Sequence, residues 1–143
     1  MSNICAGIGL GQIKILDDNA KKRRKNHLFY RDLFYDIDSV ELLEAVNEDF
    51  HSNYWLNTIL MKSPNQNKDK ECLRLTLEAN NIESRPIWKP MHLQPVFQNF
   101  PYYGKNIAEG LFEKGLCLPS GGLTDENKDK IKRVIRSFFD CKK

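Results

Sequence analysis

Apolar side chains recur at helical spacing along the first 38 residues of the chain. A stripe that returns every three, four or seven positions comprises Ile13, Leu16, Ala20, His27, Tyr30 and Phe34. This period is that of one face of an α-helix, so we predict a single long helix over residues 3–38. Gly7, Gly9 and Gly11 near its start each destabilise a helix by up to about 1 kcal/mol, so we expect them to pack closely against another backbone.

Beyond residue 38, short apolar stretches alternate with amphipathic ones. Aromatic and β-branched residues in partial alternation, or a short apolar run, predict strands over residues 54–61, 82–88 and 116–118. Helical periodicity predicts helices over residues 71–81, 106–114 and 124–139. The acidic, mixed residues 39–52 predict a short helix or loop, and residues 63–70 predict a turn that leads into the next helix.

Several residues in these helices are expected to be buried or to form caps. The helix over residues 71–81 is predicted to have Cys72, Leu75 and Ala79 on one face. Gly115 is the residue type expected just beyond the end of the second helix. Thr124 is an expected N-cap of the last helix. The inward residues of that last helix are predicted to be Ile131, Val134, Ile135 and Phe138.

The order of the elements predicts an α/β (α+β) fold. In this fold, helices cover a small three-stranded, largely antiparallel sheet. We expect residues 1–38 to form a long linking helix and residues 39–143 to form a small α/β domain. The 143 residues, 41% of them hydrophobic and 29% charged, are typical of one soluble globular domain.

Composition excludes few classes of function, but it indicates the partners, the cellular compartment and the state of the cysteines. The net charge of +3 is too small to indicate a nucleic-acid or membrane partner. No apolar run approaches the roughly 20 residues of a membrane-spanning helix, and no signal peptide is recognisable, so we expect a cytoplasmic protein. The four cysteines lie far apart without a CxxC pair, which indicates reduced thiols and no metal site.

Three further features have ordinary structural interpretations. The stretch AGIGLGQ at residues 6–12 is not a dinucleotide-binding loop, because no strand precedes it. The run KKRRK at residues 21–25 lies within a predicted helix, and a solvated helix face explains it better than a grip on nucleic acid. His27 and His51 each stand alone, so we interpret both as structural or surface residues.

The segment SRPIWKPMHLQPVF at residues 84–97 is unusual for a loop. Its prolines prevent one continuous helix, yet it contains Arg85, Trp88, Lys89 and His92. One interpretation is a proline-fixed loop whose Trp88 and Phe97 fill a core. The other is a loop that binds a sugar nucleotide, with arginine and lysine on phosphate oxygens, tryptophan against a ring and histidine on a hydroxyl or phosphate. Local chemistry leaves both open.

Three stretches of the chain resemble one enzyme family. They are ESRPIWKPMHLQPVF at residues 83–97, GLCLPSGGLT at 115–124 and MSNICAGIGLGQIKILD at 1–17. Taken in their order along the chain, they resemble the C-terminal region of the DegT/DnrJ/StrS-type sugar aminotransferases, which depend on pyridoxal phosphate (PLP). The resemblance covers nearly the whole chain and is weak over residues 40–80. The WKPMHLQPVF version is most similar to members that aminate 4-keto-6-deoxy sugars linked to UDP.

The resemblance implies a role for this chain as a part of such an enzyme. It implies the small domain of a fold-type I PLP enzyme whose PLP-binding large domain lies upstream, and no lysine here matches the family's Schiff-base motif. We therefore expect the chain to have no catalytic or cofactor-binding residues of its own and to be inactive alone. Transamination requires the aldimine that such a lysine forms.

The resemblance also assigns site residues and partners. It implies that Arg85 and Lys89 meet the phosphates or a carboxylate of the sugar nucleotide. Trp88 would form a wall of the nucleotide site, and His92 would hydrogen-bond the sugar nucleotide. Ser2 and Asn3 would line the same cleft. A homodimer, or self-association through residues 1–35, is expected because the start of the chain would present bare apolar side chains.

Two other hypotheses stay open at this stage. One is a truncated, non-catalytic remnant that binds sugar nucleotides or assembles with a partner. The other, less favoured, is a nucleic-acid-binding module led by the basic run, although we expect neither a nucleic-acid nor a membrane partner.

Overall fold

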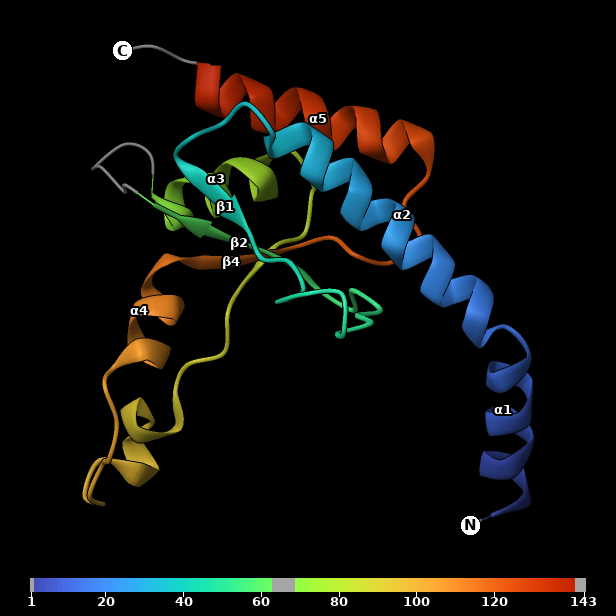
Figure 1. Cartoon of the computed structure of the whole chain (residues 1–143), viewed down its shortest axis with the longest axis horizontal. Coiled ribbons are helices and arrows are strands. Elements are labelled where there is room, and N and C mark those ends of the chain that lie inside the picture. The colour runs from blue at the N-terminus through green and yellow to red at the C-terminus, as the bar shows by residue number, and fades with distance from the viewer. Residues whose placement is uncertain (1, 63–68, 141–143) are drawn as a thin grey trace.

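A computed structural model of the chain describes residues 2–62 and 69–140. Within these residues the chain forms a mixed α/β fold with four strands, five α-helices and two short 3-10 helices (Figure 1). The elements in chain order are α1 Asn3–Lys14, α2 Leu16–Phe34, β1 Val40–Leu42, β2 Asn57–Met61, α3 Lys70–Ala79, β3 Arg85–Pro86, η1 Met91–Leu93, η2 Pro95–Phe97, α4 Ile107–Lys114, β4 Gly115–Leu118 and α5 Asp125–Asp140. None of the helices in the described ranges is long and apolar enough to cross a membrane.

The strands form one antiparallel sheet in the order β1-β2-β4-β3. In the register, Ile59 of β2 lies opposite both Leu42 of β1 and Leu116 of β4. The predicted fold class is confirmed, but the sheet has four strands instead of three. The additional strand, β1, falls in the segment predicted as a short helix or loop, because three residues are too few to show the alternation that identifies a strand.

The core lies between the sheet and the helices α2, α3 and α5, which cover one of its faces (Figure 1). Strand β2 alternates, with Asn57, Ile59 and Met61 buried and the residues between them half-buried, whereas β4 is buried at every position. The helices contribute Tyr30, Leu33 and Phe34 from α2, Leu73 and Leu77 from α3, and Ile131 and Ile135 from α5.

The predicted long helix is two helices. The break is at Ile15, whose φ of −112° and ψ of 5° are not helical, and the chain changes direction there (Figure 1). The apolar stripe is buried at His27, Tyr30 and Phe34, but Ile13 is 70% exposed. Because α1 lies off the sheet, its side chains have no core to face, and helical periodicity alone could not reveal this.

The face of α3 that the sequence singled out is not the buried one. Leu73 and Leu77, which lie four residues apart, are completely buried, whereas Leu75 is 50% exposed. Asp69 caps the helix, with its side chain accepting from the backbone N–H of Cys72. The cap and the pair of leucines on one side fix the rotation of the helix about its axis.

Helix α4 ends at the predicted residue, but Gly115 does not end it as a glycine cap. Gly115 has φ of −95° and ψ of 140°, so it does not use the left-handed conformation of a glycine cap and instead begins β4. A Cβ at this position would meet the side chain of Ile87 and would lie 2.7 Å from the carbonyl oxygen of Leu111. Close packing is therefore the reason for the glycine.

The prediction for α5 is confirmed. The N–H of Asn127 donates to Oγ1 of Thr124 over 3.2 Å, which is the expected N-cap. Ile131 and Ile135 are buried, and Val134 and Phe138 pack against the core. By contrast, the predicted strand over residues 82–88 contracts to the two residues of β3, and most of the predicted turn at 63–70 lies outside the described residues.

Candidate functional site

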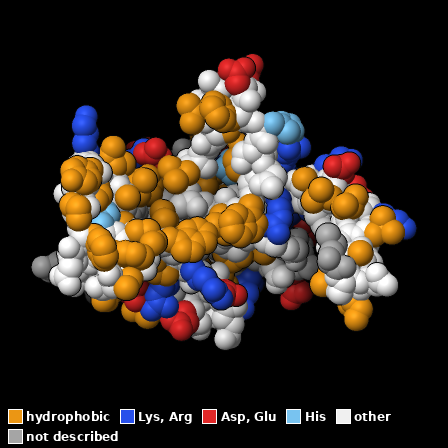
Figure 2. Space-filling view, turned by 90° about the horizontal axis from the view of Figure 1, so that it is seen from below, with side chains coloured by type: hydrophobic (Ala, Val, Ile, Leu, Met, Phe, Trp, Pro, Cys, Tyr) orange, Lys and Arg blue, Asp and Glu red, His pale blue; other side chains and the backbone are white. Residues whose placement is uncertain are grey.

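Residues 87–106 and α4 form an arm that projects from the sheet. The arm contains η1 and η2, and α1 projects from the other end of the molecule (Figure 1). Large apolar side chains are exposed along the arm, among them Trp88, Val96 and Phe100, each about two-thirds exposed. Figure 2 shows hydrophobic side chains gathered over the face seen from below, both on the side of the arm and over α1.

Three of the predicted site residues lie on the surface at the base of this arm. Arg85 is in β3, opposite Cys117 of β4, and its Nε donates to Oε1 of Glu83 over 2.8 Å. Lys89 is exposed, and Trp88 is 66% exposed. The interpretation in which Trp88 fills a core is therefore wrong, and Phe97 is only half-buried.

Trp88 has an aromatic neighbour that the sequence did not single out. The ring of Trp55, itself 60% exposed, lies 6.2 Å from the ring of Trp88 at an angle of 37°. The N–H of Trp55 donates to Oδ1 of Asn53 over 3.0 Å, and its carbonyl accepts from Nη1 of Arg23 over 2.9 Å. Two exposed indoles from distant parts of the chain thus form one aromatic surface.

Part of the basic run supports this surface. Besides Arg23, Arg24 donates from Nε to the carbonyl of Ser52 over 3.1 Å. Lys21, Lys22 and Lys25 are exposed. The run is therefore a solvated helix face only at its lysines, and its two arginines hold the loop that leads to Trp55.

His92 is held more firmly than the other predicted site residues. Its Nε2 lies 2.8 Å from Oε1 of Glu109, and the side chains are 19% and 27% exposed. The ring of Tyr102 stacks on the imidazole, with ring centroids 3.8 Å apart and an angle of 20°. The hydroxyl of Tyr102 accepts from the N–H of Asn106, which has a left-handed φ of 56° at the start of α4. These contacts join η1 to α4.

The other histidines do not belong to this arm. His27 is 2% exposed, contacts Oδ1 of Asn57 through Nδ1 at 2.9 Å and stacks on Tyr54 with ring centroids 3.6 Å apart. His51 is exposed. No group of three or more potential metal ligands occurs in the part of the chain that the structure describes.

Ser2 and Asn3 lie away from the arm. Ser2 is the N-cap of α1, where its Oγ accepts from the N–H of Cys5 over 3.3 Å. This end of α1 and the arm are on opposite sides of the molecule (Figure 1). Within this chain, the structure does not bring Ser2 and Asn3 together with Trp88 or His92.

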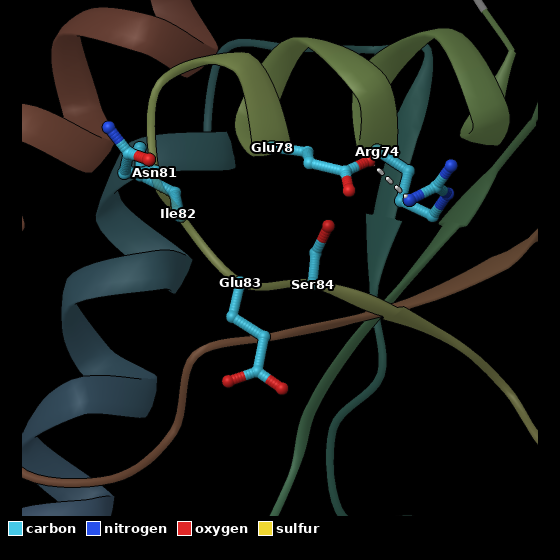
Figure 3. A pocket seen from close by; sticks show the side chains of 6 residues that line it. All are labelled: Arg74, Glu78, Asn81, Ile82, Glu83 and Ser84. Carbon is cyan, nitrogen blue, oxygen red and sulfur yellow. Dashed lines mark hydrogen bonds and ion pairs between the residues drawn. The ribbon is translucent and has the colours of Figure 1, made fainter.

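A pocket lies just before the predicted loop, between the end of α3 and the start of β3. Its lining residues are Arg74, Glu78, Asn81, Ile82, Glu83 and Ser84 (Figure 3). The guanidinium of Arg74 is paired with both Glu71 and Glu78, and two lining carboxylates face an anionic ligand unfavourably. None of the four predicted site residues lines this pocket, so it is not the site that the sequence indicated.

Comparison with known proteins identifies the family. A model of the DegT/DnrJ/EryC1/StrS aminotransferase family matches residues 1–139. The chain belongs to this family. The resemblance seen in the sequence is thereby confirmed.

Two relatives and one solved structure show how much of a longer protein the chain spans. It is 33% identical over 144 residues to EpsN of Bacillus subtilis, whose assignment is pyridoxal phosphate-dependent aminotransferase, in a match over 97% of this chain and 36% of that protein. It is 32% identical over 143 residues to GDP-perosamine synthase of Escherichia coli O157:H7, over 99% and 37% respectively. The fold matches the aminotransferase TlmJ from Streptoalloteichus hindustanus with a TM-score of 0.81 at 20% identity, over 94% and 36%. The chain thus spans about a third of the length of the relatives it matches.

The contacts of Lys70 do not suit a lysine that carries PLP. The lysine whose pKa is lowered is Lys70, and the cause is burial against α4. Its Nζ donates to the carbonyl of Phe112 and lies 4.4 Å from the centre of the Phe112 ring. This ammonium group is held between α3 and α4 as a structural contact.

Proposed function

We propose that this chain is the C-terminal domain of a PLP-dependent aminotransferase that aminates a keto group on a nucleotide-linked deoxysugar for surface polysaccharide or glycan synthesis. The arm supplies the surface that contacts the sugar nucleotide. The chain is inactive alone, since the lysine that carries the cofactor belongs to the large domain. The observation that carries this proposal is the family match over residues 1–139, together with the exposed cluster of chemically capable side chains on the arm.

The arm provides the types of contact that a sugar nucleotide requires. Lys89 and Arg85 offer cationic donors to phosphate oxygens at its exposed base. Trp88 and Trp55 offer aromatic faces to a base, and His92 offers a ring nitrogen to the sugar. Nearly all these side chains are exposed and lack core contacts, so packing does not explain their presence.

The nucleotide is proposed to be UDP, because the WKPMHLQPVF segment resembles that of family members that act on UDP-linked sugars. A relative that matches along the same region is named for GDP-perosamine, which makes a GDP-sugar the natural competitor. Both nucleotides share a diphosphate and a flat base, so the same residues serve either. Titration with both types of ligand distinguishes them.

The exposed apolar side chains of α1 are proposed to be buried against the large domain or against a second copy of the chain in a dimer. Ile4 and Ile8 are 76% and 62% exposed, and nothing lies within 4 Å of a Cβ placed at Gly7 or Gly9. A helix that is apolar around much of its surface is normally buried.

The proposal predicts saturable binding of UDP-glucose or GDP-mannose that quenches tryptophan fluorescence. Lys89→Ala should weaken binding by about tenfold or more, because a charge-assisted hydrogen bond to phosphate is lost. Trp88→Phe should reduce the fluorescence response and leave the part that comes from Trp55. Isothermal titration calorimetry measures the affinity of each variant.

Lys132→Ala is the matched control, since Lys132 is exposed on α5, away from the arm. It should bind as the unmodified chain does. The proposal is contradicted if no nucleotide or sugar nucleotide binds at millimolar concentration, or if Lys89→Ala and Lys132→Ala behave alike.

A further inference from the structure

The contact between His92 and Glu109 fixes which ring nitrogen carries a hydrogen. An ionised carboxylate offers only acceptor lone pairs, so a separation of 2.8 Å between Nε2 and Oε1 requires Nε2–H to donate. In a neutral imidazole with Nε2–H, the other nitrogen, Nδ1, has a lone pair and is an acceptor. No hydrogen bond to Nδ1 of His92 occurs among the described residues.

The ring is also fixed in orientation. Tyr102 stacks on one face of the imidazole at 3.8 Å, and the hydroxyl of Tyr102 is tied to the backbone of Asn106. Glu109 lies in the first turn of α4, which begins at Ile107, so the carboxylate is attached to a regular element. Tautomer and orientation are therefore both set before any ligand arrives, which reduces the ordering cost of binding.

We propose that Glu109 is a positioning residue for the sugar-nucleotide site: it holds His92 with Nε2–H so that Nδ1 is presented as the acceptor for a hydroxyl group of the sugar. This inference rests on the proposed function. It adds a residue, Glu109, that lies 17 positions from His92 in the chain and has no motif to mark it.

A purely structural role for the pair makes a different prediction. If the contact serves only to anchor η1 to α4, any side chain at position 92 that donates to Glu109 is sufficient. Glutamine can place its amide N–H near the position of Nε2 but has no group at the position of Nδ1. Asparagine is shorter and places a polar atom near Nδ1 without reaching Glu109. The two variants therefore separate anchoring from recognition.

The first experiment is long-range ¹H–¹⁵N NMR of the histidine rings of the full chain across a pH series that reaches the neutral forms. We expect His92 to show Nε2–H with a pyridine-type Nδ1. Glu109→Ala should convert this to a mixture of tautomers, and Glu109→Gln should retain part of the preference, since its amide oxygen still accepts. Glu113→Ala, an exposed position on the same helix, should leave the spectrum of His92 unchanged.

The second experiment compares UDP-glucose with UDP, which lacks the sugar. His92→Gln should retain the thermal stability of the unmodified chain yet bind UDP-glucose about five- to tenfold more weakly, the loss expected for one hydrogen bond. Its affinity for UDP should not change. His92→Asn should lose stability but retain more of the preference for UDP-glucose over UDP.

The inference is overturned by an Nδ1–H tautomer of His92, by a tautomer that Glu109→Ala leaves unchanged, or by equal binding of UDP-glucose to His92→Gln and to the unmodified chain. Failure of the proposed function has a different signature. In that case neither UDP nor UDP-glucose binds the unmodified chain, and the role of Nδ1 in recognition is rejected. The NMR experiment still decides whether Glu109 sets the tautomer of His92.

Discussion

At the scale of single residues, a buried polar network around Asn57 organises the junction between helix and sheet. Asn57 is completely buried, and its Oδ1 contacts Nδ1 of His27 at 2.9 Å. Its Nδ2 and its backbone N–H both donate to Oγ of Ser120, over 3.1 and 2.7 Å. Asn26 donates to the carbonyls of Ser120 and Gly121. The network therefore ties α2 and β2 to the loop before α5.

Asn57→Ala should lower the free energy of unfolding by about 2–4 kcal/mol. The substitution removes the buried partners of two side chains, and each orphaned buried polar group costs about 1–3 kcal/mol. Urea denaturation followed by circular dichroism measures the change. Asn99→Ala, at an exposed position of the arm, should remain within about 0.5 kcal/mol of the unmodified chain. Equal losses in the two variants would show that the network contributes no special stability.

At the scale of elements, the junction of α4 with β4 determines how the arm leaves the sheet. The helix ends at Lys114 and the strand begins at the next residue, Gly115, without an intervening loop. The backbone at Gly115 is close enough to Ile87 and to the carbonyl of Leu111 to leave no room for a side chain. This close approach brings the start of the arm, just after β3, against the end of α4.

A pair of glycine substitutions in α4 and β4 should have opposite effects. Gly115→Ala should destabilise the chain by about 1–3 kcal/mol, because its Cβ overpacks the junction. Gly110→Ala should stabilise it by about 0.5–1 kcal/mol, since Gly110 lies within the helix with nothing near its added Cβ and alanine is the better helix former. Thermal unfolding of both variants measures the difference. A stabilising Gly115→Ala would contradict the packing described for this junction.

Residue types and spacing within a segment predicted correctly the helix that has a side-chain cap and a regular apolar face. The N-cap Thr124 and the inward residues of α5 follow from spacing alone, and the fold class follows from the order of the elements. The strand β1 did not follow, because three residues are too few to show alternation. The break at Ile15 did not follow either, because the apolar stripe continues through it. The buried face of α3 had a local signal in Leu73 and Leu77, four residues apart, but the face with Leu75 was chosen instead.

The sequence predicted some residues of the candidate site and missed others. The sequence indicated Arg85, Trp88, Lys89 and His92 because they crowd one short segment, and the structure places that segment on an exposed arm. It could not indicate Trp55 or Glu109, because each reaches its partner only through the fold. The exposure of Trp88, which separates a surface residue from a core residue, likewise needed the structure.

At the scale of the whole molecule, the chain has the features of a part of a larger protein. Apolar side chains are exposed on α1 and on the arm, and they gather on one face (Figure 2). Exposed apolar surfaces of this kind typically mark an interaction site. The relatives that the chain matches are almost three times as long, since it covers 36% of one and 37% of another. Both observations agree with a domain that works together with a cofactor-binding domain.

The intact mass of the polypeptide that carries this sequence in its native cell tests this account most directly. Immunoprecipitation with an antibody against residues 84–97, followed by mass spectrometry, gives that mass. The account predicts a polypeptide nearly three times as long as this 143-residue sequence, with a PLP-linked lysine in the portion upstream of it. A native mass of 16.7 kDa would contradict it, because the chain would then act without a cofactor domain on the same polypeptide.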